Sequence, residues 1–440
     1  MDLRAPAASL RVRLRDRGDG ALVLRGARVP RVFLDRPPGA AADDLVAMDL
    51  TLDGPRLRLG AAPGAPAVEM GQRIVWPRTV DCHTHLDKGQ SWARSPNPDG
   101  TFDSAGAATL RDRATFASDD DLRRRAEFQL AAAHAHGTGA IRSHVDADAE
   151  TLDRRLGVLR ELATDWSGRV ELQLCPFGGG DSDDDTLAGL ATRAARLPGR
   201  TLSLFLQQAP ALPAALDHIF RAAADAGVAL DFHADETLDP ASHCLRAVAE
   251  AALRHAGGIP VLVGHACALM AQPEAEADRT LDLVAEAGIG IVSLPLCNSY
   301  LMDRAPGRTP RLRGGTLVHE MRARGIPVAL GSDNARDGYY AYGDLDTVAL
   351  FGHAARTLHL DHPVGDWPGA LGPVPADLIG TAHGRIADGG PADLILFDAR
   401  TWSEFLSRPE SGRIVLNRGI PVDARPPAYP DLDDLKGLTP

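Results

Sequence analysis

The stretch PAALDHIFRAAADAGVALDFHA, residues 213 to 234, decides the fold class of this chain. Its first part repeats apolar residues at intervals of three and four up to Gly227, as an amphipathic helix does. Its second part is a short β-type run. The same succession of helix and strand recurs along the chain from Gly137 onward. This alternation predicts a parallel sheet covered by helices.

Eight candidate strands share this β-type composition, and three of the intervening segments have a clear helical period. The strands are expected at 80–85, 139–145, 169–175, 201–207, 228–234, 260–266, 290–296 and 327–333, and the helices at 120–137, 213–227 and 275–288. Eight strand–helix units predict a (β/α)8 barrel of the TIM type.

Both ends of the chain differ from this middle part, because short apolar runs are broken there by Gly and Pro. They include SLRVRLRD (9–16), ALVLRGARV (21–29), LVAMDLTLDG (45–54) and PRLRLG (55–60), and later ADLILFDA (392–399) and GRIVLNRGIPV (412–422). We expect both ends to build one small β-sandwich domain. The predicted division is 1–76 for its N-terminal part, 77–384 for the catalytic barrel, and 385–440 for its C-terminal part and tail.

Charge and hydropathy narrow the class of partner. The 440 residues carry a formal net charge of -12 with scattered basic residues, which disfavours nucleic acid or an anionic membrane as the main partner. We see no apolar run of membrane-spanning length and no signal-peptide core. Five cysteines without a CxxC pair favour reduced thiols. These features predict a cytoplasmic protein that acts on a small molecule, and they leave a homo-oligomer open.

Five residues that can bind or polarise a metal ion end four of the predicted strands. His83 and His85 lie two apart, so both side chains point to the same face of the first strand. His233, His265 and Asp333 end the fifth, sixth and eighth strands, where a barrel places functional groups. Each of them alone is commonly a packed structural group. Together they predict a metal centre, and imidazole with carboxylate suits Zn(II) or Fe(II).

Glu236 follows His233 by three residues in the run HADE. A carboxyl group beside the metal could carry a proton to the substrate. Its other interpretation is an acidic residue in the first turn of a helix, which the helix dipole favours.

Several motifs, in this order and at these intervals, resemble the amidohydrolase superfamily and, within it, the cytosine deaminase group. They are HTHLDK (83–88), IRSHVD (141–146), VELQL (170–174), HADE (233–236), GHA (264–266), LPLCN (294–298) and GSDN (331–334), and ADLILFD (392–398) and RIVLNRG (413–419) resemble the closing β-segment.

The resemblance implies that His83, His85, His233 and Asp333 hold one divalent metal. It also implies a catalytic set in which Glu236 shuttles the proton, His265 lies near the hydroxide, and Asp333 accepts a proton. Relatives with two metals bridge them through a lysine on strand four. The run TLSLFLQ (201–207) has none, which favours a single ion.

Two departures from the cytosine deaminase pattern concern the substrate. Asn334 stands where those enzymes have an aspartate, and CPFGGGD (175–181) lacks the glutamine that binds the pyrimidine edge. Both disfavour cytosine itself and indicate a larger or differently oriented ring. The candidate substrate-binding residues are Phe177, Gly179, Asn298, Asn334, Tyr339 and Tyr340, although loop packing explains the tyrosines equally well. His144 and Asp146 either orient the metal ligands or pack at the barrel mouth.

We therefore predict a metal-dependent amidohydrolase that deaminates a small nitrogen heterocycle, such as a cytosine-like, amino-pyrimidine or amino-triazine ring, and releases ammonia. One alternative is hydrolysis of a cyclic amide such as a lactam or imidazolone. A second is release of an alkylamine, because Asn334 and the following ARD resemble N-isopropylammelide amidohydrolase. A third is a non-catalytic relative that binds metal or ligand.

Overall fold

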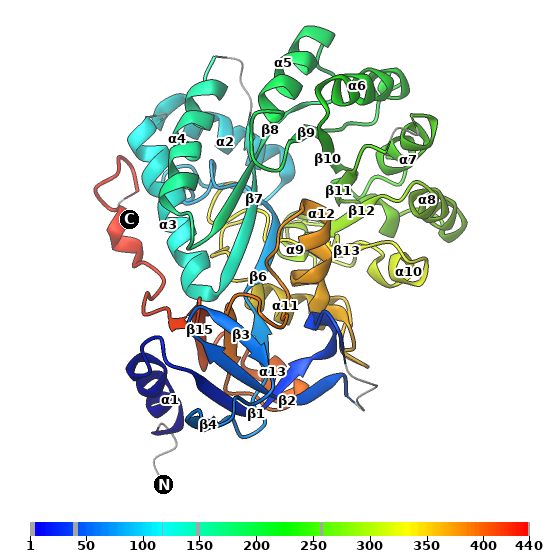
Figure 1. The fold of residues 1–440 in the computed structure, drawn as a ribbon. Coiled ribbons are helices and arrows are strands. Elements are labelled where there is room, and N and C mark those ends of the chain that lie inside the picture. Colours follow the sequence, from blue (N-terminus) through cyan, green and yellow to red (C-terminus); the bar gives the residue numbers. More distant parts are fainter. Residues whose placement is uncertain (1–4, 38–42, 117, 147–149, 256–257, 439–440) are drawn as a thin grey trace.

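The computed structural model describes residues 5–37, 43–116, 118–146, 150–255 and 258–438. Eight parallel strands form one sheet in sequence order (Figure 1). They are β6 (Thr79–Thr84), β7 (Thr138–Asp146), β8 (Glu171–Gly179), β9 (Thr201–Phe205), β10 (Ala229–Ala234), β11 (Val261–His265), β12 (Gly290–Ser293) and β13 (Val328–Leu330). A parallel bridge between Thr84 and Asp333 closes the sheet. The predicted (β/α)8 barrel is therefore confirmed.

Helices surround the strands of this barrel (Figure 1). They are α2 (Phe102–Phe116), α3 (Asp119–His136), α4 (Leu152–Asp165), α5 (Asp184–Ala194), α6 (Leu212–Ala226), α7 (Cys244–Arg254), α8 (Glu274–Glu286), α9 (Pro295–Leu301), α10 (Val318–Ala323), α11 (Thr347–Thr357) and α12 (Pro373–Ile379). Short 3-10 turns lie at Arg31–Phe33, Cys267–Met270, Trp367–Leu371 and Tyr429–Leu432.

Local chemistry fixes the ends of α3. The Ser118 side chain accepts a hydrogen bond from the Asp121 backbone N–H at the start of the helix. Gly137 ends it with a left-handed φ of 108°, where its N–H donates to Ala133 O. A Cβ at Gly137 would lie 2.5 Å from Ile395 Cδ1, so glycine also permits the close approach of the C-terminal sheet.

The two chain ends form two four-stranded sheets below the barrel (Figure 1). One contains β1 (Leu22–Pro30), β2 (Leu45–Asp53), β3 (Arg56–Leu59) and β4 (Ala67–Glu69). The other joins β5 (Val75–Pro77) to β14 (Leu394–Phe397), β15 (Arg413–Asn417) and β16 (Ile420–Pro421), and α13 (Trp402–Ser407) follows β14. The expected contribution of both ends to one β-region is thus observed.

One predicted strand was wrong, because SLRVRLRD lies within helix α1 (Ala5–Asp16). Its alternating apolar residues fit a strand, but Leu10 and Leu14 are also four apart, as on one face of a helix. Both leucines are buried, while Val12 between them is 51% exposed. Packing of that helical face beside β16 therefore outweighed the alternation.

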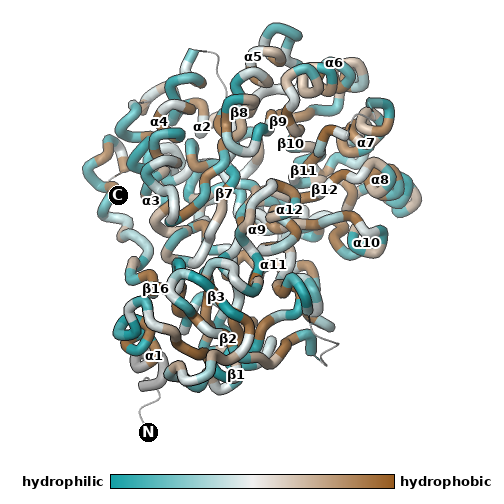
Figure 2. Tube along the Cα trace, viewed as in Figure 1, coloured by the Kyte–Doolittle hydropathy of each residue, from teal (hydrophilic) through white to brown (hydrophobic). Residues whose placement is uncertain are grey.

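Apolar residues concentrate in the strands and on the inner faces of the helices (Figure 2). Trp76 of β5 is completely buried, and its ring packs on Phe33, Phe397 and Phe405 at centroid distances of 4.8–5.6 Å. It also contacts Phe351 of α11 at 5.5 Å. This aromatic cluster ties the small β-region to the base of the barrel.

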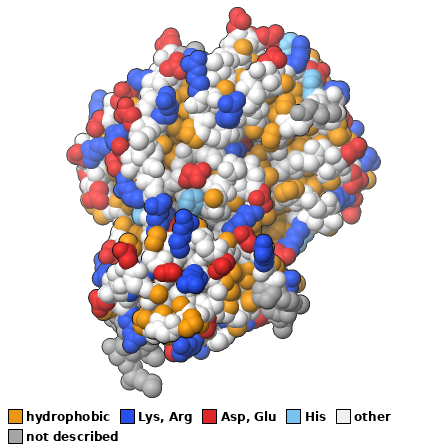
Figure 3. Space-filling model, viewed as in Figure 1, with side chains coloured by type: hydrophobic (Ala, Val, Ile, Leu, Met, Phe, Trp, Pro, Cys, Tyr) orange, Lys and Arg blue, Asp and Glu red, His pale blue; other side chains and the backbone are white. Residues whose placement is uncertain are grey.

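Basic and acidic side chains are interspersed over the face shown in Figure 3. Among the described residues, none of the helices has the length and apolar character needed to cross a bilayer.

Candidate active site

The first strand of the barrel brings two imidazoles to its mouth. His83 and His85 lie at the end of β6 and are 0% and 3% exposed. Their Nε2 atoms lie 3.7 and 3.3 Å from Asp333 Oδ1. The i, i+2 spacing on a strand accounts for this common orientation.

His233 and His265 complete the cluster from β10 and β11. His233 Nε2 lies 3.2 Å from His85 Nε2, and its ring centre lies 4.4 Å from that of His83. The ring centre of His265 lies 5.1 Å from that of His233. Its Nδ1 is 3.1 Å from the amide nitrogen of Asn298, which fixes the orientation of the ring.

The backbone at two of these strand ends is in the left-handed region. Asp333 has φ 63° and His265 has φ 73°, which is uncommon for residues other than glycine. The Asp333 N–H donates to His83 O at 2.9 Å, and the Asp81 carboxylate accepts from Ser332 N at 3.1 Å. These bonds hold the Asp333 segment against β6 and aim its carboxylate at the imidazoles.

The cluster has the donor set of a metal site. Both ring nitrogens of His83 and both carboxylate oxygens of Asp333 are buried without a hydrogen-bond partner among the described residues. Such groups are costly to bury unless something binds them. One ligand atom each from His83, His85 and Asp333 lies within 4.8 Å of the others. A divalent ion fits these residues, because it would satisfy the unpaired nitrogens and oxygens together.

His144 of β7 joins the cluster more closely than the sequence indicated. Its ring centre lies 4.3 Å from that of His83 and 4.7 Å from that of His233. One nitrogen from each of these three rings also falls within 4.8 Å of the others. His144 therefore packs directly on the predicted ligands, as its position at the end of the second strand allows.

Burial makes the imidazoles of the site neutral at pH 7. It lowers the pKa of His83, His85, His144 and His233 well below the ordinary value, and the neighbouring imidazoles, with Lys88 for the first three, act in the same direction. Neutral imidazole is the form that binds metals.

Glu236 approaches the cluster from the loop after β10. Its side chain is 6% exposed, and Oε1 lies 3.4 Å from His265 Nδ1. Burial, followed by the charge of Asp333, raises its pKa well above the ordinary value. The preceding residue, Asp235, accepts hydrogen bonds from the backbone N–H groups of Cys244 and Leu245 at the start of α7. The HADE loop is thereby anchored to the next helix, and Glu236 lies outside the first turn of α7.

A cavity of about 310 Å³ opens over these groups. It is lined by His85, Lys88, Phe102, Arg113, Asp146, Phe177, Gly178, Gly179, Phe205, His233, Glu236, His265, Asp333, Asn334 and Tyr339. A wider groove of about 660 Å³ shares Phe102, Phe205 and Glu236 with it and leads outward. The volume and the aromatic walls suit a small planar molecule.

Four of the six predicted substrate-binding residues line this cavity: Phe177, Gly179, Asn334 and Tyr339. Asn298 and Tyr340 are not among the lining residues. Asn298 lies behind His265, and the Tyr340 ring packs on Tyr300 and Tyr342 at centroid distances of 5.6 and 5.8 Å.

The glycines of CPFGGGD have packing reasons of their own. A Cβ at Gly178 would lie 2.7 Å from Leu190 Cδ1, and one at Gly180 would lie 2.4 Å from Leu206 Cδ2. Neighbouring leucine side chains fill the space beside both glycines, so these glycines leave no extra room for substrate. Gly178 and Gly179 contribute backbone to the cavity wall instead.

Four side chains of the lining, those of Phe102, Phe205, Lys88 and Arg113, were assigned no role from the sequence. Phe102 begins α2 and Phe205 ends β9, with ring centres 6.0 Å apart and planes 17° from parallel. Lys88 and Arg113 bring positive charge from the turn after β6 and from α2. The sequence signal for Lys88 was its rarity, because the chain has only one other lysine, Lys436.

Comparisons with known proteins agree with this geometry. A family model described as the amidohydrolase family matches residues 195–422. Pterin deaminase from Rhizobium rhizogenes is 46% identical over 423 residues, which cover 94% of this chain and 97% of that protein.

Solved structures of similar fold include two enzymes. 5-Methylcytosine deaminase from Klebsiella pneumoniae superposes with a TM-score of 0.77 at 23% identity, covering 92% of this chain and 97% of that one. N-isopropylammelide isopropylaminohydrolase from Burkholderia multivorans gives a TM-score of 0.69 at 26% identity, covering 91% and 98%.

Proposed function

The chain belongs to the amidohydrolase family, and we propose that it deaminates a pterin, replacing the 2-amino group by oxygen and releasing ammonia. The observation that carries this proposal is the 46% identity, over nearly the whole of both chains, to a pterin deaminase. The broader function, metal-dependent deamination of a nitrogen heterocycle, is the one predicted from the sequence.

We assign the metal to His83, His85, His233 and Asp333. Three neutral imidazoles and one carboxylate are donors that suit Zn(II) or Fe(II). The unpaired, buried nitrogens of His83 and oxygens of Asp333 support this assignment. When bound, a divalent ion supplies hydroxide near neutral pH by lowering the pKa of water.

Proton movement is assigned to two carboxyl groups. Asp333 accepts a proton from water at a carboxylate oxygen. Glu236 carries a proton and donates it to the ring nitrogen next to the attacked carbon, so that negative charge does not build up on the ring. A new C–O bond forms at C2, and the C2–N bond breaks once its nitrogen is protonated as ammonia.

His265 orients the reacting oxygen in this scheme. Its Nδ1 lies at hydrogen-bond distance from the Asn298 amide nitrogen, while its Nε2 is buried without a partner among the described residues. The free nitrogen is the one we assign to the oxygen that adds to the ring. Asn298 therefore acts as a positioning residue.

The cavity walls support a ring larger than cytosine. Phe177 and Tyr339 offer aromatic faces, and Phe102 with Phe205 extends the apolar wall toward the outer groove. Asn334 lines the cavity as an amide, and its Nδ2 donates to Asp337 at 2.8 Å. No carboxylate stands at 334 to receive the amino group of cytosine.

The test is ammonia release from pterin, cytosine, amino-triazines, purines and creatinine-like rings by protein reconstituted with Zn(II) or Fe(II). We expect pterin to be the best substrate, with formation of the 2,4-dioxo ring followed by absorbance. Chelation should abolish turnover and metal should restore it. Ammonia from another ring but none from pterin would overturn the substrate assignment. Loss of ring absorbance without ammonia would indicate ring opening and overturn the deaminase assignment.

A further inference from the structure

The Lys88 ammonium group lies on the cavity wall, and the mechanism above does not use it. Its side chain is 7% exposed, and Nζ lies 3.2 Å from Asp146 Oδ1. Two aromatic rings flank the ammonium group, with Nζ 5.1 Å from the centre of Tyr339 and 5.7 Å from that of Phe177. The backbone is fixed as well, because Lys88 N donates to His85 O and Lys88 O accepts from Ser91 Oγ.

The Asp146 carboxylate pairs with more than one cation, so it does not fully neutralise the positive charge of Lys88 and Arg113 on this wall of the cavity. Its Oδ2 pairs with Arg113, and its backbone oxygen accepts from Arg155 Nη1 at 3.0 Å. Although burial opposes it, these cations hold the pKa of Asp146 well below its ordinary value. The two cations that line the cavity, Lys88 and Arg113, therefore outnumber the carboxylate between them.

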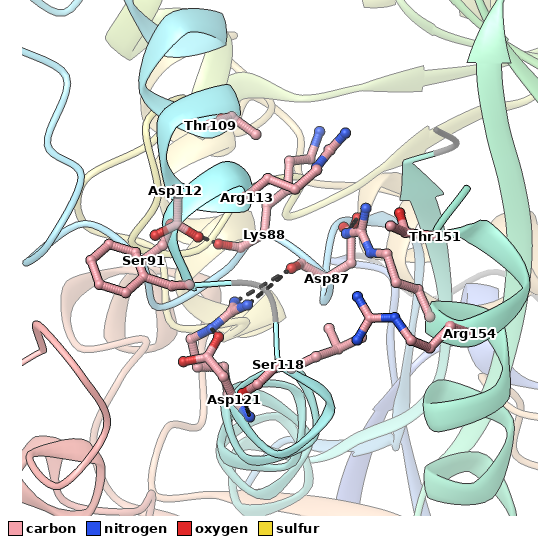
Figure 4. Close-up of a pocket in the computed structure, with 14 residues that line it drawn as sticks. Asp87, Lys88, Ser91, Thr109, Asp112, Arg113, Ser118, Asp121, Thr151 and Arg154 are labelled. Carbon is pink, nitrogen blue, oxygen red and sulfur yellow. Dashed lines mark hydrogen bonds and ion pairs between the residues drawn. The ribbon is translucent and has the colours of Figure 1, made fainter. Parts of the chain in front are cut away.

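Lys88 also borders a second, smaller cavity. This cavity has a volume of only about 40 Å³ and is lined by charged residues that include Asp87, Arg113 and Arg155 (Figure 4). Asp87 Oδ2 is engaged by Arg155 and by the backbone N–H of Asp146. A lysine has three N–H donors, and Asp146 takes one of them. Because Lys88 also lines the larger cavity, the other two donors are available to a molecule bound there.

Several other polar side chains of the large cavity already have partners. Asn334 donates its amide to Asp337, and Arg113 pairs with Asp146. The position after strand three, where the resembling group has a glutamine for the ring edge, is occupied by Phe177 and glycines. Among the described lining residues, Lys88 is thus a cation held between two aromatic rings with donors available to an acceptor on the substrate ring.

We propose that Lys88 donates a hydrogen bond to the 4-oxo oxygen of the substrate ring and makes the enzyme select 4-oxo over 4-amino rings. The inference rests on the proposed pterin substrate. When water adds at C2, the electron density pushed onto the ring before Glu236 delivers its proton extends to that oxygen, and a fixed ammonium group stabilises it. A 4-amino group presents N–H donors to the cation instead, so the donors of Lys88 that face the ring have no acceptor there.

The first experiment compares pterin with 2,4-diaminopteridine, using wild-type protein, Lys88→Met and the control Lys436→Met. Lys436 is the only other lysine and is exposed on the C-terminal tail, so the control makes the same chemical change away from the cavity. For Lys88→Met with its metal content verified, we expect kcat/KM for pterin to fall roughly 10²–10³-fold, as for loss of a donor to a developing oxyanion. The inhibition constant of the diamino ring should stay unchanged or improve, and Lys436→Met should match wild type.

The second experiment needs no variant at position 88 and reads binding directly. With lysine labelled at ¹³Cε, the zinc-loaded protein should show two lysine signals, which the Lys436→Met variant assigns. Adding the 2,4-dioxo product should shift the Lys88 signal, whereas the 2,4-diamino ring should not. The Lys436 signal should stay in place with both ligands.

The outcomes separate this inference from the proposed function. If wild-type protein releases no ammonia from pterin, the proposed function fails. If wild-type protein deaminates pterin but Lys88→Met keeps full activity and the 4-oxo preference, this inference fails and the proposed function stands. The same conclusion follows if the Lys88 signal does not shift when the product is added. A loss confined to pterins with an added anionic substituent would assign Lys88 to that substituent and would also overturn it.

Discussion

Replacing Gly264 by alanine should damage the proposed metal centre, although none of its ligand side chains is replaced. Gly264 lies in β11 next to the His83 ring, and a Cβ there would be 2.8 Å from His83 Cε1 and 3.1 Å from Nδ1. Ordinary contacts begin at 3.4 Å. The imidazole must therefore give way by roughly half an ångström, which is the tolerance within which a catalytic constellation has to be held.

The ring has little room to move. His83 is completely buried, and its ring centre lies 4.3 Å from that of His144 and 4.4 Å from that of His233. Overpacking of this kind costs about 1–3 kcal/mol of folding free energy. Displacing a ligand by its surroundings typically weakens metal affinity by about 10–100-fold. We expect effects of that size on the stability of the metal-free protein and on its zinc dissociation constant.

Gly157→Ala is the matched control. Gly157 lies in α4, and a Cβ there would meet nothing within 4 Å. The same added methyl should stabilise that helix by about 0.5–1 kcal/mol. Zinc affinity is measured by competition with a fluorescent chelator, stability by urea unfolding, and kcat/KM by ammonia release. If Gly264→Ala matches Gly157→Ala in zinc affinity and kcat/KM, the placement of His83 in the metal site is refuted.

Three further variants probe separate parts of the molecule. Glu236→Gln should keep its metal but lower kcat by roughly 10²–10⁴-fold, since the amide cannot carry the proton; near-normal turnover would remove the shuttle role. Burial, with Arg78 and Arg169, lowers the pKa of His134 to about 4. Between pH 6.5 and 4 the unfolded chain therefore binds a proton that the folded chain does not. The free energy of unfolding should decrease by at most about 3 kcal/mol as the pH is lowered through this range. An asparagine at 134 would keep an acceptor for Arg78 but cannot be protonated in this range. The urea midpoint of His134→Asn should therefore decline less than that of the wild type as the pH is lowered, and an equal decline would show that His134 is not the cause. Leu435→Ala should cost about 2 kcal/mol by opening the contact of the tail with Phe128 while leaving kcat/KM intact, and unchanged unfolding would show that the tail does not stabilise the barrel.

The sequence was informative about the barrel because a parallel barrel brings all strand ends to one mouth. His83, His233, His265 and Asp333 could be grouped without any distance, since each ends a predicted strand. The resemblance to the amidohydrolase superfamily, drawn from these same residues, is confirmed by the family match and by the 46% identical relative. Their roles in the site stay predictions.

Residues contributed by loops and helix starts were harder to predict, because their neighbours are set by long-range packing. Phe102 and Phe205 belong to no motif, yet their rings stack on one wall of the cavity. His144 was visible in its motif, but its contact with His83 depends on how β7 curves against β6. SLRVRLRD failed for a related reason, since its pattern fits both a strand and a helix, and the neighbouring β16 decides.

Asn334 shows why a single departure from a motif is not a complete specificity signal. Its Nδ2 donates to Asp337 Oδ2 at 2.8 Å, and Asp337 also accepts from the backbone N–H groups of Tyr339 and Tyr340. Asp337 is completely buried, and burial raises its pKa. A carboxylate at 334 would face this second carboxylate at hydrogen-bond distance, where two negative charges cannot both persist. The amide at 334 therefore matches Asp337, which in turn binds the backbone of Tyr339 and Tyr340. The ring preference at this end of the cavity is set by Asn334 and Asp337 together and not by position 334 alone.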